Sequence, residues 1–348
     1  MRVHNFGAGP CALPLGVLEE VRDELTEYGH SGMSVVEMSH RSADYEVIHQ
    51  ETVAAARRIS GAPEDFAVLF LQGGATLQFA MVPLNLLAPG ERAGHVLSGS
   101  WAKAAYADAA ALGTGYVAWD GSAGGYTNMP ASGEVSLEEA TRYLHITSNE
   151  TIDGIRMIEL PDVDVPLVAD MSSEYLARPV DWSRYDLVYG GVQKNLAPAG
   201  MALVFVRSAA LAETSDLGTY LRYETHIKGN SLANTPAMFQ AWVMGKVFAH
   251  LEARGGVAGL VYRAIDSSEG FYRSHVEPLV RSHTNVVWRL PSEDLEKSFV
   301  AAASEAGMVG LKGHRSVGGI RASLYAATDI TSVEVLVEFM TDFAAANR

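Results

Sequence analysis

The stretch Asp186-Leu-Val-Tyr-Gly-Gly-Val-Gln-Lys194 joins a short apolar run to two glycines and a single lysine. The apolar residues are typical of a buried strand, and the glycines let the backbone turn closely past a ligand. Burial of an amine at this point would disfavour its charged form, lower its pKa and make it a nucleophile that can form a Schiff base. For an isolated stretch of this kind, a lysine that ends a strand and reaches solvent is the more common case.

The apolar runs on either side of this stretch predict an α/β fold. Strand-like runs lie at Ala67–Leu71, Gly94–Leu97, Tyr116–Trp119, Tyr143–Thr147, Pro166–Ala169, Leu187–Tyr189 and Ala202–Val206. Helical patterns lie at 15–28, 43–60, Thr76–Leu87 and Ala102–Leu112. Because helices separate several of the strands, we expect a large domain with a mostly parallel sheet between helices.

The pattern changes after about residue 230. We expect a long helical stretch at 236–281, a strand at Asn285–Leu290, a helix near 293–306, a strand at Ile320–Leu324 and a last helix near 331–345. This order is typical of a smaller C-terminal α+β domain. We therefore predict a large domain over 15–235, and a smaller domain that combines 1–14 with 236–348.

Composition restricts the class of protein. The chain has 348 residues, of which 48% are apolar and 19% charged, and its net charge is −15. This acidity argues against nucleic acid or an anionic membrane as a partner. The start of the chain has no apolar signal-peptide core and no long uncharged apolar run follows, so we expect a cytoplasmic protein. A single cysteine, Cys11, excludes an intramolecular disulfide and a multi-cysteine metal site, and we expect no metal.

A second segment, Phe70-Leu-Gln-Gly-Gly-Ala-Thr-Leu-Gln-Phe79, suits a phosphate. A strand runs into two glycines, and a helix is expected to start near Ala75 or Thr76. The free N–H groups and the dipole of a helix N-terminus bind anions, and Thr76 adds a hydroxyl donor. On its own the signal is weak, because most Gly-Gly pairs only turn the chain.

A third segment, Val168-Ala-Asp-Met-Ser-Ser173, places Asp170 at the end of a predicted strand, 24 residues before Lys194. Ligands of α/β proteins bind at the carboxyl ends of parallel strands. A buried carboxylate there could keep the nitrogen of a pyridine cofactor protonated. Alternatively, Asp170 caps the next turn together with Ser172 and Ser173.

In this order, a phosphate site, a carboxylate and a Schiff-base lysine together indicate pyridoxal 5'-phosphate. Over nearly its whole length the chain resembles the phosphoserine aminotransferase family, which belongs to the class V, fold type I (aspartate-aminotransferase-like) enzymes that use this cofactor. The motifs that carry the resemblance are Asn5–Pro10, Ser34–Arg41, Gly73–Thr76, Asn149–Gly154, Ala169–Ser173, Gly191–Asn195, Asn234–Pro236 and Lys312–Ser323. The last of these is the most specific to that family.

The resemblance implies a role for each residue around the cofactor. Lys194 would hold the cofactor and move the substrate proton, Asp170 would pair with the ring nitrogen, and Trp101 would stack on the ring. The resemblance also implies that the cofactor contacts Gly74, Ala75, Thr76, Thr151 and Gln193. Asn234 and Thr235 would contact it from a second subunit. Some members of the family have an arginine where Thr76 stands, so here the phosphate would depend more on backbone N–H groups.

Charge indicates the substrate. The segment 312–321 contains Lys312, His314, Arg315 and Arg321 and no acidic residue. An arginine fork binds a carboxylate through two hydrogen bonds, so we expect Arg321 to bind the substrate α-carboxylate. The resemblance implies that His314 and Arg315, with His40 and Arg41 of a neighbouring subunit, bind the substrate phosphate or the side-chain carboxylate of glutamate. A solvated basic turn is the alternative for Lys312–Arg315, because glycines surround it.

The implied reaction is a ping-pong transamination in a homodimer with active sites at the subunit interface. L-Glutamate and 3-phosphohydroxypyruvate would give 2-oxoglutarate and O-phospho-L-serine, as in serine biosynthesis; a related four-carbon substrate of pyridoxine biosynthesis is also implied. An alanine–glyoxylate or serine–pyruvate type aminotransferase of the same class, or a non-catalytic protein with this fold, are the alternatives. A cysteine desulfurase is excluded, because Cys11 lies in the Gly9-Pro10 turn and not in a late loop.

Overall fold

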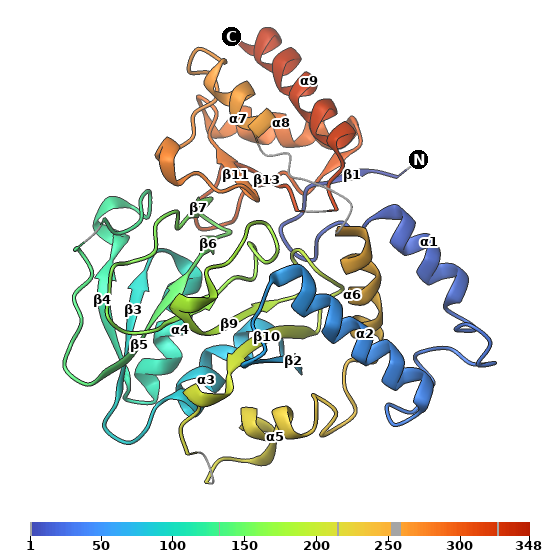
Figure 1. Cartoon of the computed structure of the whole chain (residues 1–348). Coiled ribbons are helices and arrows are strands. Elements are labelled where there is room, and N and C mark those ends of the chain that lie inside the picture. Colours follow the sequence, from blue (N-terminus) through green and yellow to red (C-terminus); the bar gives the residue numbers. More distant parts are fainter. Residues whose placement is uncertain (1, 132, 214–215, 252–258, 326) are drawn as a thin grey trace.

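A computed structural model describes residues 2–131, 133–213, 216–251, 259–325 and 327–348 (Figure 1). Within these residues, seven strands form one sheet in the order β2-β10-β9-β8-β5-β3-β4. Their bounds are β2 Phe66–Gln72, β3 Arg92–Leu97, β4 Gly115–Asp120, β5 Thr141–Thr147, β8 Leu167–Asp170, β9 Tyr185–Gly191 and β10 Met201–Arg207. β10 pairs antiparallel with β2 and β9, and the other neighbours pair parallel. The predicted mostly parallel sheet is confirmed.

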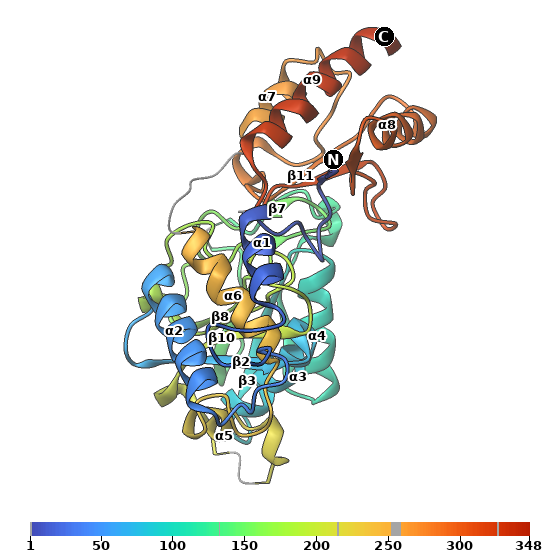
Figure 2. The same cartoon turned by 90° about the vertical axis from the view of Figure 1, so that its right-hand side faces the viewer.

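Helices cover both faces of the sheet (Figure 2). The helices of this part are α1 Leu15–Glu24, α2 Ala43–Ser60, α3 Gly74–Leu86, α4 Ser100–Ala111, α5 Tyr223–Lys228 and α6 Met238–Leu251. Successive side chains of a strand point to opposite faces. Along β2, Phe66, Val68 and Phe70 therefore pack into one core with residues of α2 and α6, whereas Leu69 and Leu71 pack into another with residues of α3 and α4. Burial on both faces explains why the strands are continuous apolar runs in the sequence.

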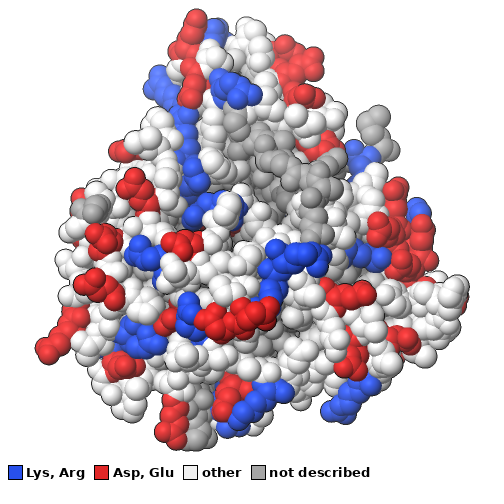
Figure 3. Space-filling model, viewed as in Figure 1, with Lys and Arg blue, Asp and Glu red and all other residues white. Residues whose placement is uncertain are grey.

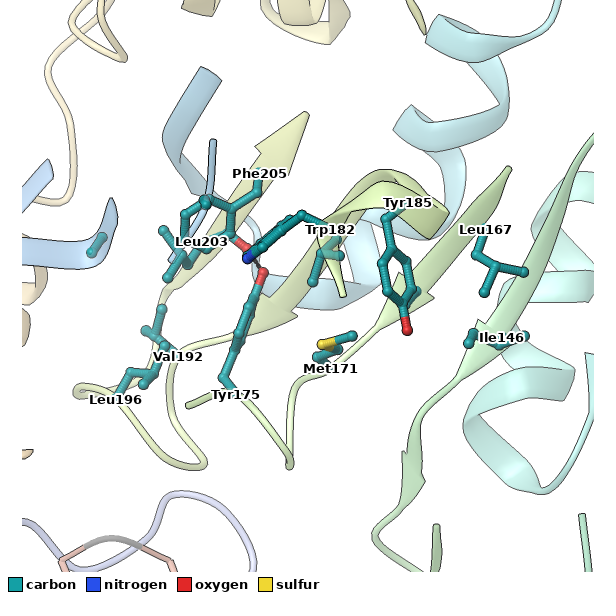
Figure 4. Close-up of a cluster of buried hydrophobic side chains, with 14 of the residues drawn as sticks. Ile146, Leu167, Met171, Tyr175, Trp182, Tyr185, Val192, Leu196, Leu203 and Phe205 are labelled. Atoms are coloured by element: carbon teal, nitrogen blue, oxygen red, sulfur yellow. Dashed lines mark hydrogen bonds between the residues drawn. The ribbon is translucent and has the colours of Figure 1, made fainter. Parts of the chain in front are cut away.

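Figure 4 shows the core on the α2 and α6 face of the sheet. Trp182 and Phe205 pack with ring centroids 5.1 Å apart. Tyr175 reaches the same core, and its hydroxyl donates a hydrogen bond of 2.8 Å to the carbonyl oxygen of Leu203. Because this bond satisfies the buried hydroxyl, Tyr175 can pack its ring against Gly190 at the end of β9.

The C-terminal part has its own core. Its elements are α7 Gly259–Asp266, β11 Asn285–Trp288, α8 Glu293–Glu305, β12 Met308–Val309, β13 Ile320–Ser323 and α9 Ile330–Asn347. β11 pairs antiparallel with β13, and the N-terminal β1 (His4–Asn5) pairs parallel with β12. Phe6 packs into this C-terminal core. The domain boundary after residue 235 stays a prediction; α6, which follows it, packs with α1 and α2.

The expectation of one long helix over 236–281 is wrong beyond Asp266. α6 ends at Leu251, residues 252–258 lie outside the described residues, and α7 ends at Asp266. Glu269 and Gly270 have φ values of 50° and 85°. This left-handed backbone cannot continue a right-handed helix, so turns follow α7.

In the described parts of the chain, no helix is long and apolar enough to cross a membrane. Acidic side chains are spread over the face shown in Figure 3, and several Lys and Arg side chains lie near the middle of the view with acidic side chains between and below them.

Candidate active site

The candidate site lies where β8 and β9 end. These strands are parallel neighbours, and Asp170, the last residue of β8, is opposite Tyr189 in the sheet register. The N–H group of Gly191 donates a hydrogen bond of 2.9 Å to the Ser172 hydroxyl. A Cβ atom on Gly190 would lie 2.5 Å from the ring of Tyr175, so only glycine allows this approach. The Gly-Gly pair therefore brings the segment after β9 against the segment after β8.

Lys194 follows β9 and is buried, with 8% of its surface exposed. Its Nζ donates a hydrogen bond of 2.5 Å to Thr151 Oγ1 and lies 5.1 Å from the centre of the Trp101 ring. Burial lowers the pKa of Lys194, and the carboxylates of Asp170 and Glu150 partly oppose this shift. The alternative of a lysine that reaches solvent is wrong, and the amine has the environment of a nucleophile.

Asp170 is also buried, with 4% of its surface exposed. Its Oδ1 accepts hydrogen bonds from the N–H group and the hydroxyl of Ser172, at 2.8 and 2.6 Å. Burial raises the pKa of Asp170, and the charge of Lys194 is the largest influence that opposes this rise. The capping role is thus present in the structure. Because both bonds end on Oδ1, this role is compatible with a ligand at Oδ2.

Glu150 lies beside Thr151 and was not predicted as a functional residue. Its side chain is fully buried, and its carboxylate accepts hydrogen bonds from the backbone N–H groups of Trp101 (3.2 Å) and Ala102 (2.9 Å) in the first turn of α4. Burial raises the pKa of Glu150 to about 7. The one sequence signal for Glu150 was its place in the Asn149–Gly154 motif. Its contact with α4 could not be predicted, because Trp101 lies 49 positions earlier in the sequence.

Arg321, in β13 of the C-terminal part, contacts Thr151, the residue that binds Lys194. Its Nη1 donates a hydrogen bond of 3.4 Å to the carbonyl oxygen of Thr151. Burial is the largest cause that lowers the pKa of His314, and the positive charges of Arg321 and Arg315 lower this pKa further. The loop that carries His314 closes on itself, since the N–H group of Gly313 donates to the carbonyl oxygen of Gly319 at 2.9 Å. Arg315, at the tip of this loop, is exposed.

The predicted phosphate site is the N-terminus of α3, which begins at Gly74. Gly73 and Gly74 have φ values of 92° and 60°, a conformation that favours glycine. Ala75 is half-buried and Thr76 is exposed. The first N–H groups of a helix have no partner within it, so this turn can bind an anion. The half-buried Gln193 is next to Lys194, and its carbonyl oxygen accepts a hydrogen bond of 3.0 Å from the N–H group of Cys11.

Four predicted residues lie apart from this cluster. His40 and Arg41 precede α2, and Asn234 and Thr235 are exposed beside the end of β2, where Gln72 Nε2 donates to the carbonyl oxygen of Thr235 at 2.8 Å. Across the described ranges, no hydrogen bond or ion pair joins any of the four to Lys194 or Arg321. The same ranges hold no group of His, Cys, Asp and Glu side chains arranged to bind a metal.

The comparisons agree with this geometry. The family model described as "Aminotransferase class-V" matches residues 3–336. The chain is 48% identical to the phosphoserine aminotransferase of Niallia circulans over 98% of each chain. Its structure is similar to that of phosphoserine aminotransferase from Bacillus circulans subsp. alkalophilus, with a TM-score of 0.96 and 47% identity over 100% of this chain and 99% of that one.

A third protein is more distant in sequence. The PLP-bound phosphoserine aminotransferase of Trichomonas vaginalis is 32% identical, with a TM-score of 0.91, and the alignment covers 98% of this chain and all of that one. The order of the motifs, the buried lysine at the end of β9 and the full-length similarity lead to one conclusion. The chain belongs to the class V aminotransferase family.

Proposed function

We propose that this protein transfers the amino group of L-glutamate to 3-phosphohydroxypyruvate, giving 2-oxoglutarate and O-phospho-L-serine. Relatives that match nearly the whole chain at 42–48% identity are named for the phosphoserine reaction. The observation that carries the proposal in this chain is the buried amine of Lys194, held by Thr151 near the buried carboxylate of Asp170. A non-catalytic protein would have no reason to bury an amine and a carboxylate in this way.

The residues present fit pyridoxal 5'-phosphate. Trp101 Nε1 and Arg321 Nε are buried and have no hydrogen-bond partner among the described residues, so polar atoms near Lys194 are left for a ligand. Lys194 would hold the cofactor through Nζ, and Asp170 Oδ2 would keep the ring nitrogen protonated. The N-terminus of α3, from Gly74 to Thr76, would bind the phosphate. When bound, this cofactor supplies an electron sink for the negative charge that develops on the substrate α-carbon.

Lys194 would also move the proton. Because burial lowers its pKa, a larger fraction of Nζ is neutral at neutral pH than in a solvated lysine. A neutral amine would take the proton from the substrate α-carbon and pass it on to the bound cofactor. Thr151 Oγ1 orients Nζ through its hydrogen bond, and the burial of both side chains keeps water away from the transfer.

Substrate choice would depend on the basic residues. Arg321 would bind the α-carboxylate that glutamate and phosphoserine share, since its guanidinium lies beside Thr151. His314 and Arg315 would bind the phosphate, together with His40 and Arg41 of the partner subunit. An alanine–glyoxylate or serine–pyruvate type enzyme has no use for this charge, which disfavours that alternative.

The proposal includes a homodimer. His40, Arg41, Asn234 and Thr235 make no polar contact with Lys194 within the described part of one chain, which is consistent with their serving the site of a second subunit. Asn234 and Thr235 would then reach the cofactor phosphate across the interface. We also propose a cytoplasmic location and, as a second substrate, the phosphorylated four-carbon oxo acid of pyridoxine biosynthesis.

The proposal can be tested by visible spectroscopy of the purified protein loaded with pyridoxal phosphate. O-Phospho-L-serine, L-glutamate and L-alanine are added in separate cuvettes. Loss of the cofactor band with the first two and not with alanine supports the proposal. Loss with alanine alone favours the alanine–glyoxylate type. A protein that shows no band even with added cofactor would contradict the proposed use of pyridoxal phosphate.

A further inference from the structure

Glu150 forms a link between the lysine site and helix α4. Each oxygen of its carboxylate accepts one backbone N–H group, Oε2 from Trp101 and Oε1 from Ala102. Residues 149–150 form β6, which pairs with β7 (Ile155–Arg156), so the backbone of Glu150 is itself fixed. The next residue, Thr151, accepts the hydrogen bond from Lys194. Two adjacent residues thus bind the two parts of the site: Glu150 binds the first turn of α4, and Thr151 binds Lys194.

The Glu150 carboxylate packs closely against Gly99. A Cβ atom on Gly99, the residue before α4, would lie 2.6 Å from Glu150 Cδ and 2.8 Å from Asp153 Oδ2. Glycine at position 99 therefore permits the carboxylate to reach the first turn of the helix. The N–H groups at the N-terminus of α4 favour the charged form of Glu150, whereas its complete burial opposes that form.

Trp101 is the second residue of α4, so the position of its indole depends on how the first turn of the helix is held. The ring centre lies 5.1 Å from Lys194 Nζ, and Nε1 has no hydrogen-bond partner among the described residues. The indole packs against the apolar core that α3 and α4 form with the sheet, and no hydrogen bond of its own fixes it there. The hydrogen bond of 3.2 Å from the backbone N–H group of Trp101 to Glu150 fixes the backbone that carries the ring.

We propose that Glu150 is a positioning residue, which fixes the indole of Trp101 in the orientation that stacks on pyridoxal phosphate. This inference rests on the proposed function, because the stacking ligand is the cofactor proposed there. Glu150 acts on the cofactor through Trp101, and the reacting atoms do not touch its carboxylate.

The test is a double-mutant cycle on cofactor binding to the apoenzyme. The dissociation constant of pyridoxal phosphate is measured for the wild type, Glu150→Gln, Trp101→Ala and the double variant. Glutamine has the size of glutamate but presents an NH2 group toward one of the two N–H donors. We expect Glu150→Gln to weaken cofactor binding about tenfold in the wild-type background. In the Trp101→Ala background, the same substitution should change binding less than about twofold.

A matched control separates positioning from charge. Asp153 is a second buried carboxylate beside Gly99, and its Oδ2 has no hydrogen-bond partner in the described residues. Asp153→Asn removes a neighbouring carboxylate that is near the charge of Lys103 in α4 but accepts no hydrogen bond from the N–H groups of that helix, and we expect cofactor binding within about twofold of wild type. If Glu150→Gln does not unfold cooperatively, Glu150→Asp, which keeps the charge but is too short to reach both N–H groups, replaces it in the cycle.

The outcomes are distinct. A loss with Glu150→Gln that persists in the Trp101→Ala background would overturn the inference, because the effect would then not pass through the indole. An unchanged dissociation constant for Glu150→Gln would overturn it as well. A wild-type protein that does not bind pyridoxal phosphate would instead contradict the proposed function, so the two failures can be told apart.

Discussion

Burial keeps two histidine rings near the candidate active site in their neutral form. His95 and His145 stack with ring centroids 5.2 Å apart, and His145 Nε2 forms a hydrogen bond of 2.9 Å with the hydroxyl of Tyr189, which is opposite Asp170 in the sheet. Burial lowers the pKa of His95 from 6.5 to about 4 and lowers that of His145 as well. Both rings are therefore neutral at the pH at which the unfolded chain would begin to bind protons.

This shift predicts a loss of stability in acid. A lowered pKa means that the unfolded state binds more protons than the folded state, so stability decreases as the pH falls from 6.5 to about 4. Between pH 7 and pH 5, His95 should cost about 2 kcal/mol of the free energy of unfolding. We expect His95→Phe, which keeps a ring in the stack, to lose correspondingly less stability over this interval. Urea unfolding at the two pH values measures the difference, and an identical loss in both proteins would contradict the account.

Some site residues were predictable at this scale and one was not. Lys194 and Asp170 follow apolar runs that are typical of buried strands, so the sequence predicts both at the edge where α/β proteins bind ligands. Glu150 has no such signal. Its role depends on a contact with α4, whose two donors lie 49 and 48 positions earlier in the chain, so no local pattern marks it.

At the scale of elements, the N-terminus of α3 predicts how cofactor affinity can be raised. Thr76 is exposed in the first turn of this helix and offers a hydroxyl but no charge. An arginine there would add a charge-assisted hydrogen bond to the cofactor phosphate. We expect Thr76→Arg to tighten binding of pyridoxal phosphate to the apoenzyme by about tenfold, and Thr76→Gln, similar in length but uncharged, to leave it nearly unchanged. Equal affinities for the two variants would place the phosphate elsewhere.

The loop between Gly313 and Gly319 predicts substrate selectivity. Its ends are joined by a backbone hydrogen bond, and Arg315 is exposed at its tip. Arg315→Ala should raise the KM for O-phospho-L-serine about tenfold or more and that for L-glutamate far less, because the phosphate carries more negative charge. Arg22→Ala, on the exposed surface of α1, serves as the control. Steady-state kinetics with each amino donor measures this, and equal losses would show that Arg315 does not contact the phosphate.

Strands that are buried on both faces and helices with one apolar face could be predicted from the sequence. All seven strands of the sheet lie where apolar runs predicted them, and α2 matches its expected range of 43–60. The strand pairs β1–β12 and β6–β7 were not predicted, because each strand has two residues and depends on a partner outside its own segment. The broken helix after Asp266 was missed because nothing in its apolar spacing marks the left-handed turn at Glu269.

At the scale of the whole molecule, a buried polar network joins β6 and the segment after β8 to the C-terminal part. Asn149 Nδ2 donates to Ser173 Oγ at 2.7 Å and to Asn285 Oδ1 at 2.8 Å, and Asn285 Nδ2 continues to Ser323 and Tyr325. Arg321 adds its bond to Thr151 beside this network. Arg321 and Lys194 thus lie on two parts of the chain that this network joins.

The proposed dimer makes a prediction that one chain alone cannot satisfy. Lys194→Ala and Arg41→Ala should each be inactive or nearly so as homodimers. If Arg41 serves the site of the partner subunit, a hybrid dimer contains one intact site, so subunits exchanged in equal amounts should recover about a quarter of wild-type activity. Two Lys194→Ala preparations carried through the same exchange are the control. Without recovery in the hybrid, Arg41 would have to act within its own chain.

The account as a whole is tested most directly by following the amino nitrogen. The enzyme loaded with pyridoxal phosphate is incubated with L-glutamate labelled at its amino nitrogen and an equimolar mixture of 3-phosphohydroxypyruvate, glyoxylate and pyruvate, and the labelled products are identified by mass spectrometry. The account predicts that the label appears first and predominantly in O-phospho-L-serine. Label that accumulates in glycine or alanine, with little or none in phosphoserine, would contradict it.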